Sequence, residues 1–103
     1  MTNISEHFRL AAKDWVEKDG AARMLDESKT SVLAQRISFL GDIPHNKAER
    51  EVKSSDEWQD YLKKMVEAKT AANLARVKMD FLRMKFQEWQ SAEANARNER
   101  KMG

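Results

Sequence analysis

The stretch that decides the fold runs from Trp58 to Trp89 and reads WQDYLKKMVEAKTAANLARVKMDFLRMKFQEW. Alternate steps of three and four residues along it meet no charged side chain. We call the residues on these steps the seam: Trp58, Tyr61, Met65, Ala68, Ala72, Ala75, Met79, Leu82, Phe86 and Trp89. A heptad stripe of this kind predicts one long helix whose apolar side packs against a partner helix.

The composition favours a single all-α domain covering residues 1–103. The chain is 41% apolar and contains only three Gly and one Pro, fewer turn residues than a β-fold needs. The absence of Cys excludes disulfides, thiolate metal sites and Cys nucleophiles, and fits a reducing cytoplasm. No charge-free run approaches the roughly 18 apolar residues of a membrane span, and the N-terminus lacks the apolar core of a signal peptide. We therefore expect a soluble, cytoplasmic protein without membrane contact.

A first helix is predicted over residues 3–40. Asn3, followed by Glu6, has the form of a capping box in which Asn3 accepts from the amide of Glu6 and Glu6 reaches back. Apolar residues then recur at helical spacing as far as Leu40. Gly20 costs a helix interior about 1 kcal/mol relative to Ala, so the helix bends there or another backbone comes close. We expect one continuous helix, with or without a kink at Gly20.

The chain is predicted to reverse at residues 41–54. Gly41 can adopt the left-handed backbone conformation that commonly ends a helix, and Pro44 can occupy the first turn of a following helix. A short helix or ordered connection follows, with a weak apolar side formed by Ala48 and Val52. Ser54 or Ser55 then caps a long helix over residues 55–97, and a basic tail occupies residues 98–103.

Two long helices joined by a turn are expected to lie antiparallel, because only then does each cover the apolar stripe of the other. A turn centred near residue 49 brings Phe8 to Trp89, Trp15 to Leu82 and Leu25 to Ala72. The sequence thus predicts a coiled-coil-like antiparallel hairpin.

A second apolar line lies on the opposite side of the long helix. We call it the outer stripe, and its members are Leu74, Val77, Phe81 and Met84. One partner helix cannot cover both sides of a helix, so we expect the outer stripe to be an oligomer interface. A homodimer or higher homo-oligomer would then complete a helical bundle. The alternative is that a bent first helix or the segment 42–53 folds over this side.

The sequence contains no recognisable catalytic or cofactor pattern. The only two histidines, His7 and His45, belong to different segments and show no metal-binding spacing. There is no glycine-rich phosphate loop and no nucleophile elbow. We expect a protein that is not an enzyme and that holds no metal and no cofactor.

The basic residues concentrate in the last third of the chain. Residues 69–103 carry eight Lys or Arg and four Asp or Glu, a net charge of +4, whereas the whole chain carries +2. The candidate nucleic-acid contacts are Arg76, Lys78, Arg83, Lys85, Arg97, Arg100 and Lys101. They could contact the phosphates of single- or double-stranded DNA, with the interleaved aromatics Phe81, Phe86 and Trp89 stacking on bases. The alternative is a solvated face supported by ion pairs, with the aromatics in the core.

Three motifs in the last third carry a resemblance to a known group of proteins. They are Ala72-Asn73-Leu74-Ala75-Arg76, Leu82-Arg83-Met84-Lys85-Phe86-Gln87-Glu88-Trp89 and Ser91-Ala92-Glu93-Ala94, with a weaker echo from Ser55 to Ala68. This pattern resembles uncharacterised small α-helical proteins of tailed bacteriophages and prophages, many of them encoded near recombination or replication genes. Gln90 departs from it, because the related proteins often have Arg after the Trp.

The resemblance implies a phage origin, and so the cytoplasm of the host cell, but no established activity. Joined to the basic C-terminal half, it leads us to expect an accessory protein that binds DNA or a recombination or replication protein through the long helical hairpin. Two alternatives stay open. One is a protein-only inhibitor or adaptor that acts on a host system, such as an anti-defence protein, although the pI near 9.0 argues against an acidic DNA mimic. The other is a minor structural component of the virion.

Overall fold

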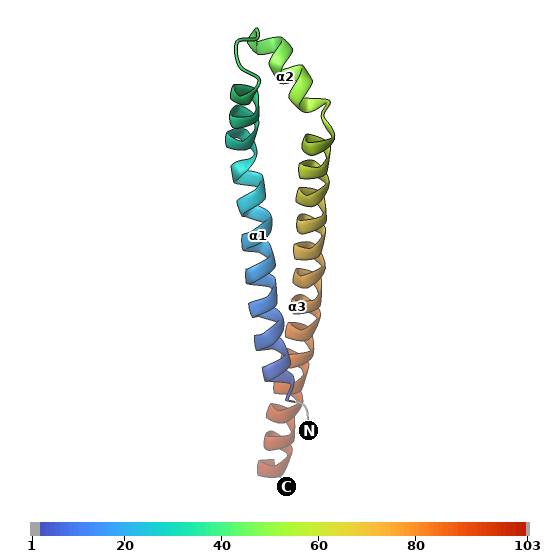
Figure 1. Ribbon diagram of the computed structural model, residues 1–103. Helices are drawn as coiled ribbons and strands as arrows, with labels where there is room; N and C mark the ends of the chain where they lie inside the picture. Colours follow the sequence, from blue (N-terminus) through green and yellow to red (C-terminus); the bar gives the residue numbers. More distant parts are fainter. Residues whose placement is uncertain (1–2, 103) are drawn as a thin grey trace.

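The computed structural model describes residues 3–102, and within that range the chain forms a long helical hairpin (Figure 1). The helices are α1 (Ile4–Phe39), α2 (His45–Lys53) and α3 (Asp56–Met102). The helices α1 and α3 lie antiparallel, and α2 bridges them at one end (Figure 1). The molecule measures 84 × 18 × 16 Å. The predicted all-α antiparallel hairpin is therefore confirmed.

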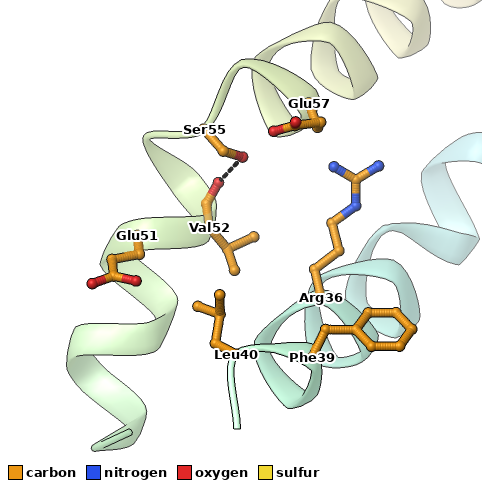
Figure 2. Close-up of a pocket in the computed structure, with 7 residues that line it drawn as sticks. All are labelled: Arg36, Phe39, Leu40, Glu51, Val52, Ser55 and Glu57. Carbon is orange, nitrogen blue, oxygen red and sulfur yellow. Dashed lines mark hydrogen bonds between the residues drawn. The ribbon is translucent and has the colours of Figure 1, made fainter.

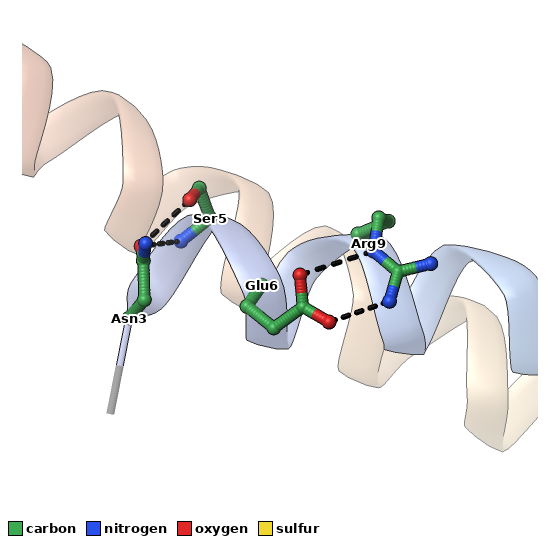
Figure 3. A network of polar contacts seen from close by, with 4 residues as sticks. All are labelled: Asn3, Ser5, Glu6 and Arg9. Atoms are coloured by element: carbon green, nitrogen blue, oxygen red, sulfur yellow. Dashed lines mark hydrogen bonds and ion pairs between the residues drawn. The ribbon is translucent and has the colours of Figure 1, made fainter. Parts of the chain in front are cut away.

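The N-terminal cap of α1 differs from the predicted capping box (Figure 3). Asn3 is the cap, but its Oδ1 accepts from the backbone N–H of Ser5 at 3.0 Å, not from that of Glu6. Glu6 does not reach back to Asn3. Its carboxylate instead accepts two hydrogen bonds from the guanidinium of Arg9, one turn further along. A charged partner three residues away competes better for the carboxylate than a neutral amide does.

The helix α1 is continuous through Gly20, as predicted. A Cβ atom added at Gly20 would meet no heavy atom within 4 Å, so no other backbone comes close at this position. Of the two alternatives for Gly20, the close approach of another backbone is therefore wrong. Gly20 lies on the exposed side of the helix, where nothing packs against it.

The reversal follows the predicted chemistry. Gly41 adopts a φ of 79°, the left-handed conformation that ends α1. Pro44 precedes α2, whose buried side consists of Ala48 and Val52. Ser55 begins α3, because its Oγ accepts from the N–H of Trp58 at 3.2 Å and donates to the carbonyl of Val52 at 2.6 Å. This serine thus connects the end of α2 to the start of α3.

The long helix ends later than predicted. We expected a helix over 55–97 and a separate tail over 98–103, but α3 continues to Met102. No Gly or Pro interrupts residues 98–102, and Glu99, Arg100 and Lys101 are good helix formers. The two cations also lie in the last turn, where positive charge favours the helix dipole. Gly103, the last residue of the predicted tail, lies outside the described residues.

The seam forms the core of the hairpin. Its residues Trp58, Met65, Ala72 and Ala75 are each less than 10% exposed, and so are Ala11 and Ala22 of α1. The Oη of Tyr61 donates to the carbonyl of Leu25 at 2.5 Å, across the two helices.

The register of the two helices is about one turn away from the predicted one. Phe8 stacks on Phe86, with ring centroids 6.2 Å apart, where Trp89 was expected. The reason lies at the turn. The helix α1 ends at Phe39 and α3 begins at Asp56, so the midpoint of the connection falls between residues 47 and 48. The hairpin is therefore centred there and not at residue 49.

Candidate interaction surfaces

The outer stripe is uncovered along its whole length. Leu74, Val77, Phe81 and Met84 are 67%, 60%, 55% and 58% exposed. The helix α1 packs on the seam side of α3, and α2 stays at the turn end (Figure 1). Neither a bent α1 nor the segment 42–53 folds over this surface, so that alternative is wrong. Four large apolar side chains in one line, all exposed, are typical of an interaction site.

Charged side chains flank the outer stripe. Asp80 accepts from the guanidinium of Arg83 at 3.0 Å. The Nζ of Lys85 lies 3.5 Å from a carboxylate oxygen of Glu88 and 5.5 Å from the ring centroid of Phe81. All these pairs are on the surface and join residues of α3 only, so each contributes little to stability. They place one anion and one cation beside the apolar surface.

The seven candidate nucleic-acid contacts are all exposed, but the structure does not bring them together on one face. Arg76 and Arg83 are seven residues apart and continue the row of Lys69, which pairs with Asp26 of α1 at 3.1 Å. Lys78 and Lys85 form a second row. Lys78 lines a hollow with His7, Leu10 and Asp14 of α1. The two rows therefore lie along opposite edges of the contact between α1 and α3.

The remaining three cations stand on a part of α3 that has no neighbouring helix. Because Phe8 lies beside Phe86, the start of α1 is level with about residue 90, and α3 continues beyond it (Figure 1). Arg97, Arg100 and Lys101 are on this extension, and no ion pair forms on any of them within residues 3–102. Arg76 and Lys78 are likewise unpaired in that range, whereas Arg83 and Lys85 have carboxylate partners.

The aromatic residues divide between the two sides of α3. Phe86 belongs to the contact with α1 and stacks on both Phe8 and Trp89. Trp89 is still 50% exposed, because it lies near the first residues of α1, beyond which α3 has no neighbouring helix among the described residues. Phe81 is on the outer stripe. Phe86 is therefore a packing residue, and of these three candidates Phe81 and Trp89 offer the exposed aromatic surface.

A hollow of about 460 Å³ opens at the turn end, where the three helices meet (Figure 2). Phe39, Leu40 and Val52 supply apolar surface, and the side chain of Arg36 extends toward Glu57 (Figure 2). The sequence did not indicate this hollow, since its residues come from three elements and share no periodic pattern. It combines an apolar wall with opposite charges, and no unpaired buried polar atom marks it as a site for a particular ligand.

Side chains of the types that bind metals do not gather into a metal site within the described part of the chain. Within residues 3–102, no three His, Cys, Asp or Glu side chains come together as a metal-binding group. His45 lies 3.6 Å from a carboxylate oxygen of Glu49, which also accepts from Lys53 at 2.8 Å. The hydrogen bond from Lys53 holds the pKa of Glu49 below its usual value. This is a solvated cluster on one side of α2.

Within the same range, none of the helices combines the length and the apolar character needed to cross a membrane. Comparisons with protein-family models, with characterised proteins and with solved structures found no significant match.

Proposed function

We propose that this protein is a non-enzymatic accessory protein that binds nucleic acid through the C-terminal half of α3. The observation that carries the proposal is the extension of α3 beyond α1. It presents Arg97, Arg100 and Lys101 as exposed side chains on a single helix, and none of the three forms an ion pair within residues 3–102. Cations that are not already paired can release counterions from phosphates when they bind, which is the main source of sequence-independent affinity.

The row of Arg76 and Arg83 extends the same basic region toward the middle of the hairpin. Residues seven apart are about 10.5 Å apart along a helix, so successive cations can follow the backbone of a bound strand without crowding. Trp89, half exposed between the row and the extension, adds an aromatic surface for stacking. The resemblance to phage proteins encoded near recombination and replication genes agrees with a DNA ligand.

The test measures binding of labelled single- and double-stranded oligonucleotides by fluorescence anisotropy over a series of salt concentrations. We expect binding at low salt that shows little sequence preference and weakens steeply as salt rises. On a duplex, the logarithm of the association constant should fall by about 0.9 per phosphate contact for each tenfold rise in salt concentration. Absence of binding to either oligonucleotide at micromolar protein and low salt would contradict the proposal.

The outer stripe favours a second candidate function, binding of a protein. An adaptor or inhibitor that acts on a host system, or a factor that docks on a recombination protein, would need an exposed apolar surface of this kind. The oligonucleotide measurement separates the two candidates, because a protein-only function predicts no salt-dependent association with DNA.

A further inference from the structure

We propose that the outer stripe is the interface between two copies of this chain, which pack α3 against α3 in parallel and in register. The proposal is independent of nucleic-acid binding. Three features of α3 support a second copy as the partner: the length of the outer stripe, the glutamates at its two ends and the charged residues beside it.

The outer stripe has defined ends. With the exposed Thr70 as the position before it, the stripe continues through Leu74, Val77, Phe81 and Met84 at intervals of four, three, four and three residues, the spacing of a coiled coil. The next positions in the same pattern are Glu67 on one side and Glu88 on the other. In a parallel pair each residue of the stripe faces its own copy, so these glutamates would face like charges. The contact therefore ends where the exposed apolar side chains end.

The flanking charges select a parallel arrangement. Asp80 precedes Phe81, and Lys85 follows Met84, so they lie on opposite flanks of the stripe. In a parallel two-stranded coiled coil, a residue on the first flank meets the residue five positions later on the second flank of the partner helix. Asp80 of each copy thus meets Lys85 of the other. Their side chains are 44% and 50% exposed and are accessible to a partner.

An antiparallel arrangement pairs like charges. Centred on the stripe, it would bring Lys78 against Lys78 of the second copy on one flank and Asp80 against Asp80 on the other. The parallel pair instead places Asn73 against Lys78 of the second copy, without repulsion. It also directs both C-terminal extensions the same way, so Arg97, Arg100 and Lys101 of the two copies form one basic end.

The first test is the mass in solution, measured by light scattering. We expect twice the single-chain 12.0 kDa for the wild type and 12.0 kDa for Phe81→Glu. The helix content of Phe81→Glu should be retained, because Phe81 is not in the seam. Val16→Glu is the matched control: Val16 is 61% exposed on α1, away from the stripe, and the substitution should leave the dimer intact. A wild type of 12.0 kDa throughout the micromolar range would overturn the proposal.

The second test determines the orientation with single cysteines, since the natural chain has none. Thr70→Cys lies at the start of the stripe. In the parallel dimer the two thiols face each other and oxidation should link them. In an antiparallel dimer centred on residue 79, the two copies of residue 70 are separated by 18 residues, about 27 Å along the axis, out of reach of a disulfide. Ser31→Cys, exposed on α1, is the control and should not cross-link. A dimer in which Thr70→Cys fails to cross-link would overturn the parallel arrangement.

The third test exchanges the flanking charges. In the parallel dimer, Asp80→Lys creates two lysine–lysine contacts, one between residue 80 of each copy and Lys85 of the other. The repulsion should raise the dissociation constant of the dimer about tenfold. Adding Lys85→Asp to the same chain restores opposite charges and should bring the constant back close to the wild-type value. In an antiparallel dimer residue 80 still faces its own copy, so the double substitution would give no recovery. Absence of recovery would therefore also overturn the parallel arrangement.

Discussion

The ring of Phe8 stacks on the ring of Phe86, with the centroids 6.2 Å apart and the planes 8° from parallel. The two residues are separated by most of the length of the chain. Phe86 stacks in turn on Trp89 at 5.9 Å. This cluster closes the open end of the hairpin, the end farthest from the turn. It holds α1 against α3 at the point where the alanines of the seam have given way to larger side chains.

Truncation of this cluster should destabilise the hairpin. Phe86→Ala removes the ring that contacts both neighbours and should lower the free energy of unfolding by about 2 kcal/mol, less than for a fully buried phenylalanine. Urea unfolding followed by circular dichroism measures the change. Phe39→Ala is the control, because Phe39 is 77% exposed and its replacement should change stability by no more than about 0.5 kcal/mol. Equal effects of the two substitutions would show that the stack does not form.

Replacement by alanine should change the free energy of unfolding in opposite directions at Gly20 and Gly41, the two glycines in the described part of the chain. Neither has a heavy atom within 4 Å of an added Cβ, so only backbone conformation distinguishes them. Gly20→Ala, in the interior of α1, should raise the free energy of unfolding by about 0.5–1 kcal/mol. Gly41→Ala, at a φ of 79°, should lower it by about 1 kcal/mol. Thermal unfolding measures both, and a stabilising Gly41→Ala would contradict the left-handed end of α1.

The pKa of Glu49 should depend on Lys53. The lysine donates to the Glu49 carboxylate at 2.8 Å and holds the pKa of Glu49 below its usual 4.5. Because the pKa is lower in the folded state, the contribution to stability is present above the unfolded value and is lost as the pH falls through the folded value. Lys53→Met should return the pKa toward 4.5 in a carboxyl NMR titration. Lys47→Met, on the same helix, is the control, and an unchanged pKa in Lys53→Met would refute the pairing.

The extension of α3 should carry part of the nucleic-acid affinity. Joint replacement of Arg97, Arg100 and Lys101 by Gln should reduce the salt dependence of duplex binding by about 2 to 3 units of slope, if each cation contacts one phosphate. The unfolding midpoint should not change, because all three side chains are exposed. An undiminished slope in the triple variant would place the binding face elsewhere on the protein.

The burial of the seam could be predicted from the sequence because it depends on periodicity alone. Residues at heptad spacing must share one side of a helix, and Trp58 and Met65 are accordingly among the most buried side chains. The left-handed Gly41 was likewise predictable, since few other residues tolerate that backbone. The exposure of the outer stripe follows from the same argument applied to the opposite side of α3.

Other features depend on competition between local interactions or on several elements at once. The capping partner of Asn3 depends on whether Glu6 bonds to the backbone or to Arg9. The one-turn difference in register arises from the exact ends of α1 and α3, which periodicity does not define. The hollow between Arg36 and Glu57 requires the three-dimensional path of the turn (Figure 2). The separation of the cations into two rows is different, because residues two positions apart, such as Arg76 and Lys78, lie about 200° apart around a helix, and their spacing alone predicts it.

The central claim is that α3 has one side that folds the hairpin and another that folding does not need. Met65 and Val66 are neighbours in the sequence, but Met65 is 7% exposed in the seam and Val66 is 58% exposed on the other side. The most direct measurement compares Met65→Glu with Val66→Glu by thermal unfolding at low protein concentration, followed by circular dichroism. We expect Val66→Glu to unfold cooperatively near the wild-type midpoint and Met65→Glu to lose most of its helix content and its cooperative transition. Similar behaviour of the two variants, or a greater loss in Val66→Glu, would contradict the account.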